Sequence, residues 1–133
     1  MKNKFFIITG IILAIFACVL LIKSDYEKLV SGPLKKVDYI TIDDYKITDQ
    51  DEIKKIYNIL QDVKPKGEWL PSEECTRLMV DRKFVITIIY KNNRQDILYA
   101  FRVSNLFKEL PTKYGISWGK CTEIWDYYEE FIR

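Results

Sequence analysis

The chain has 133 residues, with 21 lysines and arginines, 19 aspartates and glutamates and no histidine, giving a formal net charge of +2. This length suits one domain. The missing histidine excludes serine–histidine and cysteine–histidine nucleophiles, histidine metal ligands and a histidine pH switch. A net charge this small does not predict nucleic acid as a partner.

The basic surplus lies at the N-terminus. Residues 1–23 hold Lys2, Lys4 and Lys23 and no acid, whereas residues 24–133 hold 18 bases and 19 acids and carry a net charge of −1. This split divides the chain into a membrane anchor or signal segment at 1–23, a juxtamembrane linker at 24–35 and an extracytoplasmic α+β domain at 36–133.

An apolar run begins at Phe5 and ends at Ile22, interrupted only by one threonine and one glycine. As a helix its 18 residues would be about 27 Å long, close to the roughly 30 Å hydrocarbon core of a bilayer. We expect a transmembrane helix that contacts the membrane through residues 5–22. The alternatives are a cleaved signal peptide and a lipoprotein signal in which Cys18 is lipidated.

Charges on either side of the run predict its orientation. Lys2 and Lys4 precede the run, and Lys23 and Lys28 follow it. Acidic residues count little in this rule, so the bias favours a cytoplasmic N-terminus. We expect a single-pass protein of the cell membrane with residues 24–133 outside, or alternatively a lipoprotein or secreted protein.

After a predicted hinge at Ser31-Gly32-Pro33, the pattern indicates a strand over 37–42, a turn, and a short second strand over 45–48. The clearest helix follows. Residues 48–52 supply an N-cap and first-turn acids, and apolar residues then recur at helical spacing. The residues of that stripe are Ile53, Ile56, Tyr57 and Leu60.

The second half of the domain predicts a hairpin and a final helix. Residues 66–78 indicate a loop, with a short strand near Trp69 as an alternative. Residues 84–90 indicate the strongest strand, residues 91–94 a turn and residues 97–103 the returning strand. A helical turn is expected over 105–110 and a loop over 111–119. Thr122 caps a last helix over 123–132, where Ile124, Tyr127, Tyr128 and Phe131 form one stripe.

The predicted fold class is therefore α+β. An N-terminal transmembrane helix is followed by a small antiparallel sheet packed against two amphipathic helices, in the order β(β)-α-β-β-α.

The pattern resembles small uncharacterised extracytoplasmic domains, lipoprotein- or membrane-anchored, of Gram-positive bacteria. Three groups of residues carry the resemblance. They are Ile47-Thr48 with Asp51-Glu52-Ile53, Ile56 and Ile59-Leu60; the hairpin over 84–103; and Tyr114-Gly115-Ile116 before an aromatic terminal helix. The resemblance supports the fold and the location, and it implies no activity or catalytic residue.

Cys75 and Cys121 form an even pair in the predicted outside domain, where they could form a disulfide that closes a long loop. The alternative is two unpaired thiols packed as small hydrophobes. The chain has no Cys-x-x-Cys motif, so neither a redox site nor a zinc site is indicated.

Few residues suggest chemistry. Glu73-Glu74 beside Cys75, with Asp81 and Asp126, could supply a carboxylate pair or calcium ligands. Their spacing matches no calcium motif, and a solvated loop explains Glu73-Glu74 better. We predict no catalytic residue, no cofactor and no metal site.

Aromatic residues make up 14% of the chain and gather towards the C-terminus. Tyr114, Trp118, Trp125 and Tyr128 could form a binding surface, although filling of the core under the last helix explains them as well. The leading hypothesis is a non-enzymatic, membrane-tethered extracytoplasmic module that binds a protein, peptide or envelope component. The alternatives are an immunity or inhibitor protein that protects the cell envelope from a toxin or hydrolase, and a carboxylate-dependent enzyme.

Overall fold

A computed structural model of the chain describes residues 2–110 and 114–132. The helices are α1 (Lys2–Glu27), α2 (Gln50–Gln61), α3 (Ser72–Val80) and α4 (Thr122–Tyr127). The strands are β1 (Val37–Ile42), β2 (Tyr45–Ile47), β3 (Pro65–Leu70), β4 (Arg82–Tyr90), β5 (Gln95–Phe101), β6 (Asn105–Glu109) and β7 (Gly115–Lys120). A 3-10 turn, η1 (Leu34–Lys36), precedes β1, and a π-helical turn, η2 (Tyr128–Ile132), follows α4.

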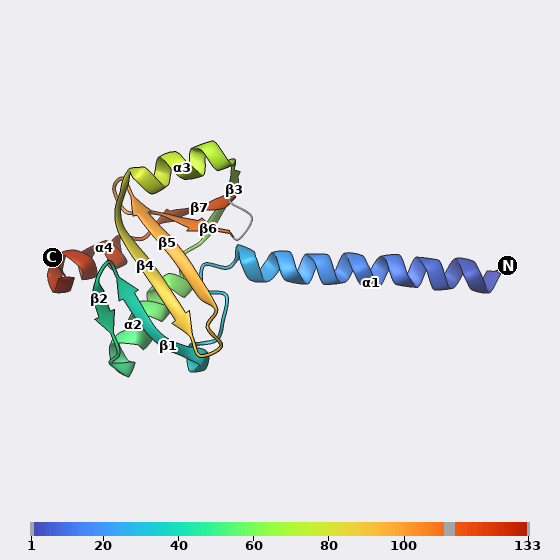
Figure 1. Ribbon diagram of the computed structural model, residues 1–133, viewed down its shortest axis with the longest axis horizontal. Coiled ribbons are helices and arrows are strands. Elements are labelled where there is room, and N and C mark those ends of the chain that lie inside the picture. The colour runs from blue at the N-terminus through green and yellow to red at the C-terminus, as the bar shows by residue number, and fades with distance from the viewer. Residues whose placement is uncertain (1, 111–113, 133) are drawn as a thin grey trace.

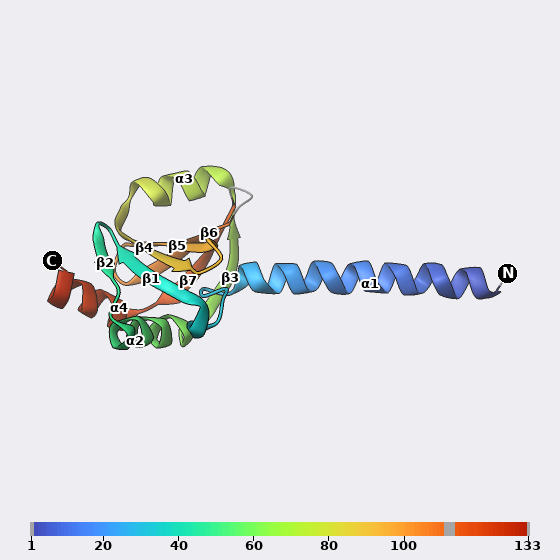
Figure 2. The same ribbon diagram turned by 60° about the horizontal axis from the view of Figure 1, so that its bottom comes forward.

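The strands form one seven-stranded sheet in the order β2-β1-β4-β5-β6-β7-β3, and every neighbouring pair is antiparallel. Helix α2 lies on one face and α3 on the other, while α1 extends away from the domain (Figures 1 and 2). The larger core joins the inward side chains of the sheet to α2 and α4, and the smaller core lies under α3. The α+β class is confirmed.

Helix α1 projects with exposed apolar side chains, from Phe5 to Phe16. Among the described residues, however, no helix is long and apolar enough to cross a membrane. The predicted transmembrane helix, and the single-pass localisation that depends on it, are contradicted by this finding.

The sheet is larger than predicted, because two segments expected to be a helical turn and a loop are strands, and the short strand considered near Trp69 is the six-residue β3. Pro65 and two further residues of low strand propensity made β3 resemble a loop, but β3 is an edge strand, where proline is tolerated. The predicted helical turn over 105–110 is instead β6, and the C-terminal part of the predicted loop over 111–119 is β7. The remainder, 111–113, lies outside the described residues.

Helix α3 occupies most of the predicted 66–78 loop. Pro71 precedes it, two acids lie in its first turn, and Cys75 and Leu78 form its buried side. Nine residues give too few turns for a clear helical period, which explains the error. The last helix is also shorter than predicted, since α4 ends at Tyr127 and the chain continues as η2.

The predicted helix and hairpin are confirmed. In α2, the Asp49 carboxylate caps the N-terminus by accepting from the amides of Asp51 and Glu52, and the four predicted apolar residues are buried. The hairpin pairs β4 with β5 in antiparallel register. Its turn places Asn93 at a φ of 66°, a conformation that asparagine tolerates.

Candidate functional site

Residues 28–33, which we call the crossing segment, connect α1 to the domain. Leu29 and Val30 are buried in the larger core. The next two residues are held by hydrogen bonds to β4, β5 and α2. The Ser31-Gly32-Pro33 sequence, predicted as a hinge, is therefore fixed against the sheet.

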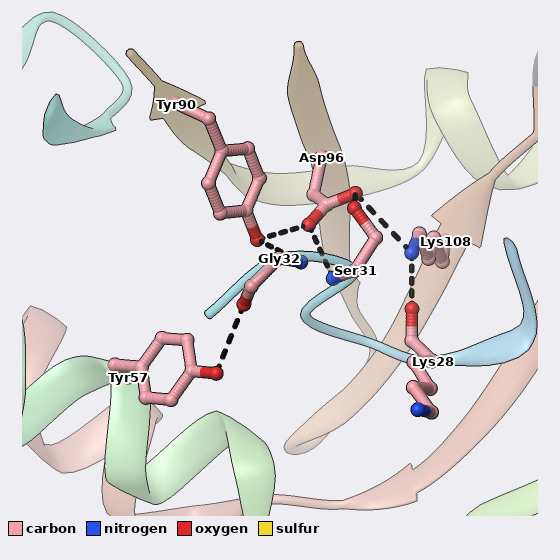
Figure 3. A network of polar contacts seen from close by, with 7 residues as sticks. All are labelled: Lys28, Ser31, Gly32, Tyr57, Tyr90, Asp96 and Lys108. Carbon is pink, nitrogen blue, oxygen red and sulfur yellow. Dashed lines mark hydrogen bonds and ion pairs between the residues drawn. The ribbon is translucent and has the colours of Figure 1, made fainter. Parts of the chain in front are cut away.

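Asp96 of β5 is the central acceptor of the network that holds this segment (Figure 3). Its carboxylate accepts from the Ser31 amide at 2.8 Å, from the Ser31 hydroxyl at 2.7 Å and from the Tyr90 hydroxyl at 2.6 Å. The residue is only 4% exposed. These donors replace the water that a buried carboxylate loses.

Lys108 of β6 supplies the compensating charge. Its Nζ lies 3.3 Å from Asp96 Oδ1, and it also donates to the carbonyl of Lys28. Burial lowers the pKa of Lys108, and the neighbouring Asp96 acts in the opposite direction. The pair leaves no net charge in the interior, which is the condition under which buried ions are tolerated.

Two tyrosines complete the network around Gly32. The Tyr90 hydroxyl accepts from the Gly32 amide at 3.1 Å, and the Tyr57 hydroxyl donates to the Gly32 carbonyl at 2.9 Å. Burial, together with the charge of Asp96, raises the pKa of Tyr90. Because each tyrosine lies on a different element, the crossing segment is held by β4 and by α2 at once.

A cleft of about 640 Å³ lies between the crossing segment, α2 and Trp118 of β7. Trp118 is 4% exposed, and its Nε1 finds no hydrogen-bond partner among the described residues. A buried N–H without an acceptor costs about 1–3 kcal/mol. The other lining residues are Lys28, Leu29, Val30, Ser31, Gly32, Pro33, Tyr57, Leu60, Gln61 and Val63.

This arrangement suits binding better than acid–base chemistry. No carboxylate is among the described residues that line the cleft, and Asp96, which holds the crossing segment, is already occupied by three donors and by Lys108. Within residues 2–110 and 114–132, no three His, Cys, Asp or Glu side chains gather into a metal-binding group. What the cleft offers instead is a lining of mainly apolar residues, including Trp118, and Lys28, whose side chain is exposed.

The four aromatic residues predicted as a binding surface occupy different environments. Tyr114 is exposed, and Trp118 is buried in the cleft wall. Trp125 and Tyr128 pack against Phe84, with ring centroids 5.0 Å and 4.2 Å apart respectively. Core filling therefore accounts for the last two, and Trp118 is the one that contributes to the candidate site.

The predicted disulfide is not formed in the structure. Cys75 and Cys121 are free and buried, and they belong to separate core clusters on opposite faces of the sheet. The pKa of each of these two thiols is raised, mainly by burial. Cys18 is exposed on α1, and its lipidation stays a prediction.

Sequence reasoning missed Asp96 and Lys108. Asp96 lies between the turn predicted over 91–94 and the strand predicted over 97–103, and Lys108 lies in a segment that was expected to be helical. One signal was available. If Leu106-Phe107-Lys108 is a strand, Lys108 lies on the same face as Leu106, which is the buried face. A lysine that is buried there requires an acidic partner that is also buried.

Comparison with protein-family models, curated proteins and solved structures gives no match. The resemblance to extracytoplasmic domains, the predicted partners and the immunity hypothesis therefore stay predictions. The predicted contact of residues 5–22 with a membrane also stays a prediction, whereas the predicted crossing of the membrane is contradicted.

Proposed function

We propose that this protein is a non-enzymatic binding module whose ligand occupies the cleft between the crossing segment, α2 and β7. One observation carries the proposal: Trp118 lines the cleft, and its Nε1 is buried without an acceptor. Nε1 has almost no accessible surface, so a ligand acceptor reaches it only when the indole turns towards the cleft. The resulting hydrogen bond would remove the cost of an unpaired buried donor. The cleft volume of about 640 Å³ lies in the range of small-molecule sites.

The lining residues favour one class of ligand. Leu29, Val30, Leu60 and Val63 make much of the lining apolar, which suits an aliphatic or aromatic body. Lys28 lies exposed at the edge of the cleft, so an anionic acceptor is favoured over a neutral one. The proposed ligand is a compact apolar molecule that ends in a carboxylate or a similar anionic acceptor.

The indole N–H resonances of the three tryptophans provide a direct test in solution. Octanoate is titrated into the full chain labelled with nitrogen-15, and octylammonium serves as the ion of equal chain length without an acceptor. We expect octanoate to move the Trp118 indole resonance downfield in a saturable way, and octylammonium to leave it in place. An unmoved Trp118 resonance would rule the proposal out.

A matched pair of variants separates the cleft from general apolar binding. Trp118→Phe removes the N–H and keeps an aromatic ring, and we expect it to weaken octanoate binding about tenfold, the equivalent of a hydrogen bond worth roughly 1.4 kcal/mol. Trp125→Phe removes the other buried, unpartnered indole N–H, which lies outside the cleft lining. Equal losses in the two variants would contradict the proposed site.

A further inference from the structure

A second cleft, of about 440 Å³, lies between the turn that joins α3 to β4 and the turn that joins β5 to β6. Both turns lie on the side of the domain away from α1 (Figures 1 and 2). Leu78 and Phe101, both buried members of the smaller core, line its interior. The cleft between the crossing segment, α2 and Trp118 is called the Trp118 cleft from here on. The second cleft shares no lining residue with it.

The rim of this cleft is cationic. Arg82, Lys83 and Arg102 line it and are exposed, and Asp81 is the acid among the lining residues. Arg82 is held in place by its donation to the carbonyl of Met79 at 3.0 Å. Because residues 24–133 carry a net charge of −1, three cations against one acid is a local concentration of positive charge.

Two irregularities of the backbone place the other cations. The register between β4 and β5 shifts between Arg82 and Phe84, so Lys83 lies in a bulge. Bulges change the direction of a side chain relative to a regular strand. Arg102 has a φ of 51°, a conformation in which glycine or asparagine is preferred.

Exposed apolar side chains accompany these charges. Val80, at the end of α3, and Val103, next to Arg102, are each 76% exposed. A bare inorganic anion would use the cations but would gain nothing from two valines. An extended ligand that combines carboxylates with an apolar side chain would use both the rim and the apolar interior of the cleft.

We infer that this cleft, the Lys83–Arg102 cleft, docks an acidic segment of a partner protein that places an apolar side chain between its carboxylates. The complementary charges would guide association and make it depend on salt. The site is independent of the proposed function, because no residue of the Trp118 cleft takes part.

Selection from a random displayed heptapeptide library on the full chain tests the inference without assuming a sequence. We expect the recovered peptides to carry acids on both sides of Leu, Ile or Phe. The affinity of a fluorescein-labelled recovered peptide, followed by anisotropy, should fall at least tenfold in Lys83→Gln/Arg102→Asn. Asparagine tolerates the φ at position 102, so this variant should keep its fold.

A second double variant removes the same charge elsewhere. Lys35→Gln/Lys54→Gln changes two exposed lysines on η1 and α2, and we expect it to keep the peptide affinity within twofold. Recovered peptides without acids, or equal losses in the two double variants, would overturn the inference. It would also be overturned if Lys83→Gln/Arg102→Asn weakened binding to phosphatidylglycerol vesicles but left peptide binding intact, because the cleft would then serve an anionic lipid surface.

Discussion

The ammonium of Lys108 and the carboxylate of Asp96 lie 3.3 Å apart, and their side chains are 3% and 5% exposed. The pair joins two neighbouring strands, β5 and β6, and through Ser31 and the Lys28 carbonyl it also holds the crossing segment. A buried ion pair contributes little net stability on its own, but removing one partner leaves an uncompensated charge. The pair therefore fixes where the chain enters the domain.

Lys108→Met should lower the free energy of unfolding by about 3–5 kcal/mol, because Asp96 then remains charged and buried without its cation. The measurement is urea unfolding followed by circular dichroism. Asp96→Asn/Lys108→Met removes both charges and keeps a hydrogen-bonding side chain for Ser31. We expect the double variant to be more stable than Lys108→Met. Additive losses would show that the two charges do not act as a pair.

Gly32→Ala should destabilise the fold by about 1–3 kcal/mol, the usual range for overpacking. A Cβ at this position would lie 2.6 Å from a ring carbon of Tyr90, which is itself held by Asp96 and cannot move freely. Gly119→Ala is the matched control, since its Cβ would meet the Lys64 carbonyl oxygen at an ordinary 3.4 Å. Similar unfolding midpoints for the two variants would contradict this account.

Local signals were sufficient to predict some elements. For α2, the Asp49 cap, the first-turn acids and the spacing of Ile53, Ile56 and Leu60 all indicate one helix, and the structure has it. The β4–β5 hairpin was predicted for a similar reason, because a run of β-branched residues leads into an asparagine turn. In both cases the preference of the segment agrees with its tertiary environment.

The remaining elements depend on contacts that the sequence does not reveal. β3 pairs with β7 across a register shift and contains Pro65, so its strand state depends on its position at the edge. The candidate cleft has the same origin, since it joins the crossing segment, Tyr57 and Trp118. Trp118 was singled out as an aromatic residue, but its missing acceptor appears only once its neighbours are placed.

The three cysteines should divide into one fast and two slow thiols. Cys18 is exposed, whereas Cys75 and Cys121 are buried and free, and burial is the main cause that raises the pKa of each buried thiol. Less thiolate and less access both slow reaction with an aromatic disulfide reagent. We expect one thiol per chain to react at once in native buffer and three after denaturation under non-reducing conditions.

Cys18→Ser identifies the fast thiol and should abolish the fast phase without changing the slow one. If only one thiol per chain were found after denaturation without a reductant, Cys75 and Cys121 would be joined in a disulfide, and the free thiols of the structure would be contradicted.

Tyr99 should make stability sensitive to alkaline pH. Burial, followed by the hydrogen bond that its hydroxyl donates to Glu109 Oε2 at 2.8 Å, raises the pKa of Tyr99 to about 12. The unfolded chain loses the proton at a pKa of about 10. The contribution of Tyr99 is therefore complete below about pH 10 and is lost as the pH rises from there to about 12.

Urea unfolding at a series of pH values measures this loss. Tyr99→Phe cannot ionise, so its stability should fall less steeply than that of the unmodified chain between about pH 10 and 12. Glu109→Gln removes the negative charge next to the hydroxyl and should give an intermediate slope, because burial still raises the pKa of Tyr99. The other buried tyrosines and thiols titrate in all three proteins, so the differences isolate Tyr99. Parallel curves for the three proteins would mean that Tyr99 ionises alike in the folded and unfolded chain.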